Sequence, residues 1–172
     1  MNERIPILYD MKLRPEWIDF ALEQYIKCDD EAAHRKTLRD YLATQIQGKE
    51  AAIKTASQLQ RNVGYRSLIP RERLEQFYAQ MSTLSSENRA AIRLQILVES
   101  TPFFADCVSE LKKLLLLGVN GIGARQLEER MNAKYGERET VTRRVHYVLQ
   151  TLALLGIVEN RDQRWCFKDE FS

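Results

Sequence analysis

The sequence has 172 residues, of which 44% are hydrophobic, and its formal net charge of +2 arises from 26 basic and 24 acidic side chains. This length and apolar content suffice for one well-buried domain or two small ones, and the weak overall charge gives no general case for binding a polyanion. No apolar run reaches the length of a signal peptide or a membrane span, so we expect a cytoplasmic protein with no membrane partner.

Composition and local signals predict an all-α, mainly helical fold. The chain has only seven glycines and four prolines, and Leu, Ala, Arg, Glu and Gln are abundant, which favours helix. Pro15 can open a first helix, the pair Asp29-Asp30 can cap a second, and a third ends at Gly64. We therefore expect an N-terminal helical subdomain over residues 1–64.

The middle of the chain predicts a break followed by short helices. Residues 64–70 interrupt the helical periodicity and are the clearest internal linker. Pro70 then opens a short helix, and a polar run over residues 82–88 leads into another. These signals predict a linker with connecting helices over residues 65–100.

The C-terminal part carries the most regular helical pattern of the chain. Thr101-Pro102 predicts a helix that ends by Gly118, and a glycine-containing turn leads into a shorter helix. In the last helix, apolar residues recur at steps of four, three, four and three, which predicts one continuous buried face. The residues of this face are Val141, Val145, Val148, Leu152 and Leu155.

A hairpin pattern follows this last helix. The chain turns from helical to extended at Gly156, and two short strands, over residues 157–159 and 164–167, flank a polar turn. In this order of elements, residues 102–168 resemble a winged helix-turn-helix. The resemblance implies a C-terminal winged helix over residues 101–172, with the hairpin as its wing and the preceding helix in a DNA major groove.

The resemblance also implies which residues contact DNA. In such domains the start of the reading helix meets base edges, and the wing meets phosphate or the minor groove. Arginines of the internal linker could follow a nucleic-acid backbone, although a solvated helix start is the commoner role of such charge runs. The full set of expected DNA contacts is Thr142, Arg143, Arg144, His146, Tyr147, Gln150, Arg161, Arg164, Lys134, Arg138, Arg66 and Arg71.

The charge of this region leaves a second interpretation open. Residues 121–172 carry 9 basic and 8 acidic side chains, which is weak for a nucleic-acid footprint. Winged helices also serve as protein-binding modules within complexes. In that interpretation, an exposed aromatic patch would contact the partner, drawn from Trp17, Tyr25, Phe77 or Tyr78.

No catalytic or metal-binding pattern stands out. Neither His34 nor His146 has a Cys, Asp or Glu at metal-ligand spacing, and we interpret His34 and its basic neighbours as a surface. The three cysteines are far apart and odd in number, which predicts reduced thiols, with Cys107 buried. We therefore expect no enzyme activity, cofactor, metal or small-molecule substrate.

The order of elements further resembles the small helical BrxA proteins of BREX phage-defence systems. Residues 54–59, residues 89–97 and the terminal helix carry this resemblance. It implies DNA binding within a defence system. The sequence thus predicts a non-catalytic accessory factor that binds double-stranded DNA, with an interaction subunit of a larger complex as the alternative.

Overall fold

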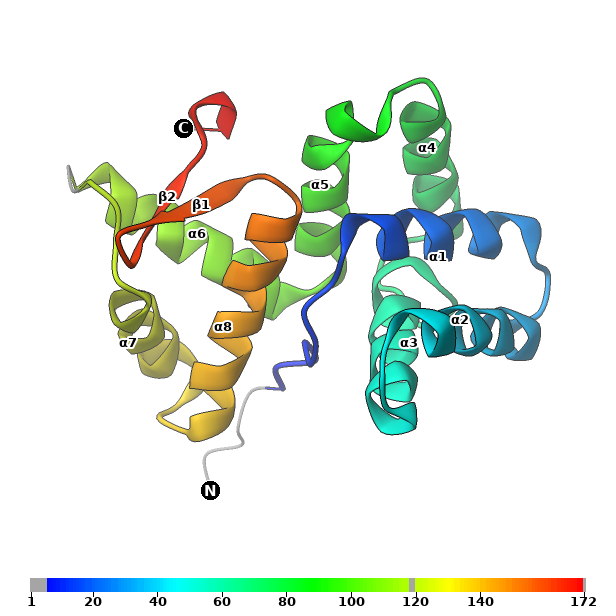
Figure 1. Cartoon of the computed structure of the whole chain (residues 1–172), viewed down its shortest axis with the longest axis horizontal. Helices are drawn as coiled ribbons and strands as arrows, with labels where there is room; N and C mark the ends of the chain where they lie inside the picture. The colour runs from blue at the N-terminus through cyan, green and yellow to red at the C-terminus, as the bar shows by residue number, and fades with distance from the viewer. Residues whose placement is uncertain (1–5, 118–119, 172) are drawn as a thin grey trace. The chain divides into compact units, whose positions relative to one another are not determined.

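The computed structural model describes residues 6–117 and 120–171. Over these residues the chain forms eight α-helices, two short 3-10 helices and one two-stranded antiparallel hairpin (Figure 1). The prediction of a mainly helical chain with a hairpin near its C-terminus is confirmed. By its internal contacts the chain divides into two compact units. We call residues 13–101 the helical unit, and residues 6–12 together with the described residues from Pro102 onward the C-terminal unit.

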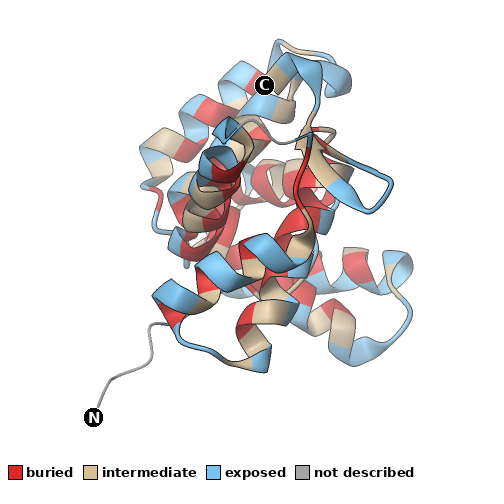
Figure 2. Ribbon diagram, turned by 90° about the vertical axis from the view of Figure 1, so that its left-hand side faces the viewer, coloured by how far each residue is buried: buried red, intermediate tan, exposed pale blue. Residues whose placement is uncertain are grey.

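Five α-helices build the helical unit, and their starts follow the predicted signals. Pro15 occupies the first position of α1, and the Asp30 carboxylate accepts hydrogen bonds from the backbone N–H groups of Ala32 and Ala33 at the start of α2. Buried residues gather on one side of the helices (Figure 2). The elements are α1 (Pro15–Lys27), α2 (Glu31–Gln45), α3 (Lys49–Val63), α4 (Arg71–Ser82), η1 (Ser86–Asn88) and α5 (Ala90–Ser100).

His34 corrects the interpretation of this residue as part of a basic surface. Its imidazole is completely buried beside the rings of Tyr25 and Tyr65. Its Nε2 lies 3.0 Å from the carbonyl oxygen of Ala21, and because a carbonyl only accepts, Nε2 carries the proton. The α3 helix ends against this ring at Gly64, where an added Cβ would lie 2.9 Å from Gln60 backbone atoms. His34 is therefore a core residue, because one helical turn of α2 faces α1 and α3.

The burial of His34 predicts that the stability of the helical unit depends on pH. Burial lowers the pKa of His34 below its ordinary value of 6.5, and the hydrogen bond to Ala21 opposes this shift. In the unfolded chain His34 takes up a proton near pH 6.5, whereas in the folded chain it does so only at lower pH. The stability that depends on neutral His34 is therefore complete above that pH and is lost as the pH falls below it. Between pH 7.5 and pH 5, the free energy of unfolding measured in urea should fall less in His34→Gln than in the unsubstituted protein. An equal loss in both would contradict this assignment.

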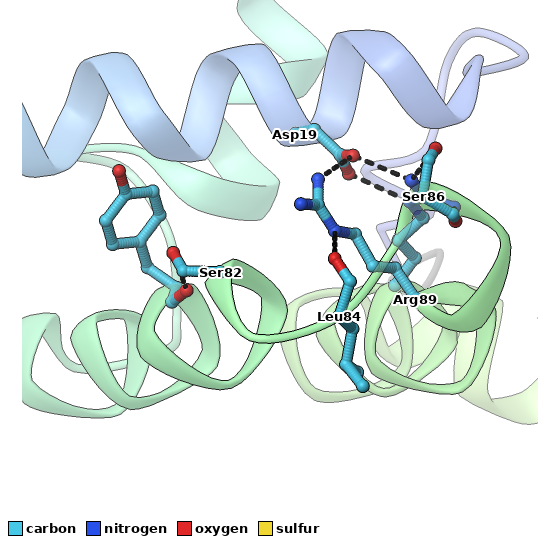
Figure 3. A network of polar contacts seen from close by, with 7 residues as sticks. Asp19, Ser82, Leu84, Ser86 and Arg89 are labelled. Carbon is cyan, nitrogen blue, oxygen red and sulfur yellow. Dashed lines mark hydrogen bonds and ion pairs between the residues drawn. The ribbon is translucent and has the colours of Figure 1, made fainter.

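A partly buried polar network connects α1, α5 and the segment before α5 (Figure 3). The Arg93 guanidinium donates to both carboxylate oxygens of Asp19, at 2.8 and 2.7 Å, and to the Ser86 carbonyl oxygen at 3.0 Å. Arg89 donates to Asp19 at 3.1 Å and to the Leu84 carbonyl oxygen at 3.1 Å. Because only 3% of Arg93 is exposed, this network fixes the 84–89 segment against the core.

The C-terminal unit packs three α-helices against one another, and α8 also packs against β1 of the hairpin. The predicted apolar face of α8 is confirmed as core, since all five of its residues are buried. The predicted end of α6 at Gly118 lies outside the described residues. The elements are α6 (Pro102–Leu116), α7 (Ala124–Tyr135), α8 (Glu139–Leu154), β1 (Val158–Arg161), β2 (Arg164–Phe167) and η2 (Asp169–Phe171).

Residues 6–12 belong to the C-terminal unit although they lie far from it in the sequence. We call them the N-terminal strap. Tyr9 is buried, its hydroxyl lies 2.6 Å from the Thr151 hydroxyl of α8, and its ring meets Phe104 of α6 edge to face at 5.3 Å. The strap thereby contributes an aromatic side chain to the core of a unit whose other elements begin at Pro102.

The hairpin is tighter than predicted. Strand β1 runs to Arg161, which pairs with Arg164, so only Asp162 and Gln163 form the turn. Both have positive φ, 51° and 64°, as a two-residue type I′ turn requires. On its other side, β2 exchanges two backbone hydrogen bonds between Trp165 and Ile122, at 2.9 and 2.7 Å.

The strained turn predicts a stabilising substitution. Because glycine adopts positive φ without steric cost, Gln163→Gly should raise the free energy of unfolding of the C-terminal unit by about 0.5 to 1 kcal/mol. Urea unfolding followed by Trp165 fluorescence in a Trp17→Phe background measures this change. Asn160→Gly is the matched control, since Asn160 lies in the extended strand β1 and should lose stability. Equal changes in the two variants would contradict the turn geometry.

Candidate functional site

The outward face of α8 contains half of the expected DNA contacts. Arg143, His146 and Gln150 are exposed, while Thr142, Arg144 and Tyr147 are half-buried. The helix holds these side chains outward because its opposite face is filled by the valine and leucine stripe. The structure thus brings Arg143, His146 and Gln150 onto one accessible helix surface.

Arg144 is engaged by the N-terminal strap. Its guanidinium forms an ion pair with the Asp10 carboxylate, and Nη1 also donates to the Asp10 carbonyl oxygen at 2.9 Å. The guanidinium lies over the Tyr147 ring, 5.9 Å from its centroid, and only 17% of the side chain is exposed. Arg144 therefore holds the strap on α8 and presents little charge to solvent.

Arg143 is the cation of α8 that faces solvent. It forms no ion pair or hydrogen bond with any residue in 6–117 or 120–171. Its neighbour His146 lies 2.7 Å from the Glu128 carboxylate, an acid of α7 that turns toward the same surface. The positive charge of this face is consequently carried by Arg143.

The remaining expected contacts of the C-terminal unit lie around α7 and the hairpin. Lys134 pairs with Asp106 at 2.9 Å, and Arg138 is half-buried at the position before α8. Arg161 and Arg164 are exposed at the two ends of the hairpin turn. Arg161 pairs with Glu159 of its own strand at 2.5 Å, and Arg164 donates to the Gly121 carbonyl oxygen at 3.5 Å.

Arg66 and Arg71 belong to the helical unit and take part in its packing. The Arg71 guanidinium lies 4.8 Å from the centroid of the Tyr25 ring, pairs with Glu75 at 3.0 Å and donates to the Ile26 carbonyl oxygen at 3.2 Å. Arg66 pairs with Glu31 at 3.4 Å. The contacts of Arg71 explain the position of its side chain without any bound ligand.

Sequence reasoning missed which acids pair with the expected basic contacts. Asp10, Asp106 and Glu128 are far from their partners in the sequence, and no local pattern connects them. Periodicity does place Glu128 and Lys134 on the same helix, but it cannot show which residue of another element each one meets. The pairing leaves a surface that is less basic than its arginine content suggests.

Other classes of site find no support in the described part of the chain. No three His, Cys, Asp or Glu side chains there lie close enough together to hold a metal ion. Cys107 is buried as predicted, and burial raises the pKa of its thiol well above the ordinary value. Among the described helices, none is long and apolar enough to cross a membrane.

Comparison with known proteins does not assign the chain to a family. The sequence matches no model of a protein family and no curated protein.

Proposed function

We propose that this protein is a non-catalytic accessory factor that binds double-stranded DNA through a winged helix formed by its C-terminal unit. The observation that carries this proposal is the order of α7, α8 and the hairpin, combined with the exposure of Arg143, His146 and Gln150 on the outward face of α8. In a winged helix this face enters the major groove, where such side chains bond base edges and phosphates. The resemblance to BrxA proteins supports a role in phage defence.

The charges of the unit predict weak, salt-sensitive binding. Arg143 of α8 and Arg161 and Arg164 of the hairpin are its exposed candidate arginines, and one of these already pairs with an acid. Each arginine that neutralises a phosphate releases condensed counterions, so affinity should fall as salt rises. We expect binding to random-sequence duplex DNA at about 50 mM salt that declines steeply toward about 200 mM.

The decisive experiment compares Arg143→Ala with Arg39→Ala by fluorescence anisotropy on a labelled duplex. Arg143→Ala should weaken binding and reduce the salt slope by about 1, as the loss of one phosphate contact requires. Arg39→Ala is the matched control, because Arg39 is an exposed arginine of the helical unit. Absence of binding even at low salt, or equal affinities of the two variants, would overturn the proposal.

A second candidate function is that of an interaction subunit in a larger complex. Of the four aromatic residues expected to form a patch for it, Trp17, Tyr25 and Phe77 are buried in the core of the helical unit and Tyr78 is half-buried, so they form no exposed aromatic patch. Leu116 and Leu117, at the end of α6, favour this second function because both side chains are strongly exposed. Exposed leucines beside one another are typical of surfaces that a partner covers.

A further inference from the structure

A groove of about 780 Å³ lies in the C-terminal unit between the end of α6 and the hairpin. Its apolar lining comes from both elements and from η2, through Leu115, Leu116, Phe167 and Phe171. This volume is within the range of ordinary ligand-binding sites. None of the expected DNA contacts on α8 lines it, so the groove is a feature apart from that helix surface.

The rim of the groove carries a small excess of positive charge. Lys112, Arg161 and Arg164 line it, together with the acids Glu159 and Asp169. Glu159 is already paired with Arg161, whereas Lys112 and Arg164 form no ion pair with any carboxylate in the described parts of the chain. Two cations beside an apolar floor therefore favour an occupant that carries carboxylates as well as apolar groups.

The exposed leucines indicate the size of that occupant. Leu116 lines the groove and is 85% exposed, and the adjacent Leu117 is 69% exposed but lies outside the groove lining. A small molecule confined to the groove would leave Leu117 in water, while a polypeptide segment can fill the groove and continue over both leucines. The concave floor of the groove can receive side chains that protrude from a partner. A membrane, by contrast, is entered by apolar groups that protrude from the protein itself.

We propose that this groove binds a segment of a partner protein that presents apolar side chains together with Asp or Glu. The apolar side chains would enter between α6 and the hairpin, and the carboxylates would pair with Lys112 and Arg164. The proposal goes beyond DNA binding and does not depend on it. It gives the C-terminal unit a protein-binding groove in addition to the outward face of α8, and the two proposed surfaces share Arg161 and Arg164 of the hairpin.

The test is an NMR titration of the 15N-labelled full-length protein with a synthetic amphipathic peptide of leucine and glutamate. A matched peptide carries lysine in place of every glutamate. We expect the glutamate peptide to shift the amide signals of Leu115, Leu116, Cys166 and Phe167, and the lysine peptide to bind at least tenfold more weakly. Leu116→Ser and the double variant Lys112→Glu/Arg164→Glu should each weaken binding of the glutamate peptide at least tenfold.

Control variants separate this proposal from general stickiness and from DNA binding. Leu68→Ser removes a leucine of the helical unit that is 66% exposed and should leave the titration unchanged, as should Arg143→Ala. Equal binding of the two peptides, or no effect of Leu116→Ser, would overturn the proposal. Preferential shifts of the groove signals by anionic phospholipid vesicles would also overturn it, in favour of a membrane surface. Loss of DNA binding in Arg143→Ala with intact peptide binding would leave it standing.

Discussion

Asp19→Ala is expected to lower the free energy of unfolding of the helical unit by about 3 to 5 kcal/mol. The reason is the position of Arg93, which is 3% exposed and directs two of its nitrogens at the Asp19 carboxylate. Removal of that carboxylate leaves a guanidinium charge buried without its counter-ion, and this costs far more than the pair contributes when intact. Arg89, which shares Asp19, would lose the same partner.

The matched control for Asp19→Ala is Glu23→Ala, one turn further along α1. Glu23 pairs with Lys27 at 2.7 Å, but both side chains are well exposed, so the change should stay within about 0.5 kcal/mol. Each unit contains one tryptophan, Trp17 or Trp165, so fluorescence in a Trp165→Phe background follows the helical unit alone. Similar midpoints of urea unfolding for the two alanine variants would show that the network is not essential.

Tyr9→Ala should lower the free energy of unfolding of the C-terminal unit by about 3 to 5 kcal/mol. Tyr9 is fully buried between α8 and α6, so its removal creates a cavity and leaves the Thr151 hydroxyl without this partner. Tyr9→Phe keeps the ring and loses only the hydroxyl bond, for an expected cost of about 0.5 to 1.5 kcal/mol. Urea unfolding followed by the Trp165 signal in a Trp17→Phe background measures both changes.

Leu8→Ala is the control for Tyr9→Ala, because Leu8 precedes it in the same strap and is 55% exposed. Its substitution should change the stability by no more than about 0.5 kcal/mol. A Tyr9→Ala variant that unfolds at the same urea concentration as Leu8→Ala would show that the strap is not part of the core. Such a result would also remove the basis for the fixed position of Arg144, which Asp10 holds from the same strap.

Local signals in the sequence determined where the helices begin and which faces are buried. Pro15, Asp30 and Pro102 mark the starts of α1, α2 and α6, and the stripe from Val141 to Leu155 is buried throughout. These features act over one or two helical turns, so they are visible without knowledge of the fold. The hairpin followed in the same way from Gly156 and the polar turn, although its turn proved to be two residues long.

Pairings between distant residues were decided only by the tertiary structure. Tyr9 meets Thr151 from 142 positions away, and Asp19 meets Arg93 from 74 positions away. Periodicity and capping carry no information about such partners, because contacts of this kind depend on how whole elements pack. His34 shows the same limit, since its basic neighbours suggest a surface while its own side chain faces the core.

In the candidate DNA-binding surface, too, some features follow from the sequence and others only from the tertiary structure. The outward positions of α8 were determined by the sequence alone, because they are the complement of its apolar stripe. Which of them present charge was decided by the fold, since Asp10 engages Arg144 and Glu128 lies against His146, while Arg143 faces solvent. The groove beside the hairpin has the same origin: its floor and rim come from α6, β1, β2 and η2, and only packing brings these elements together.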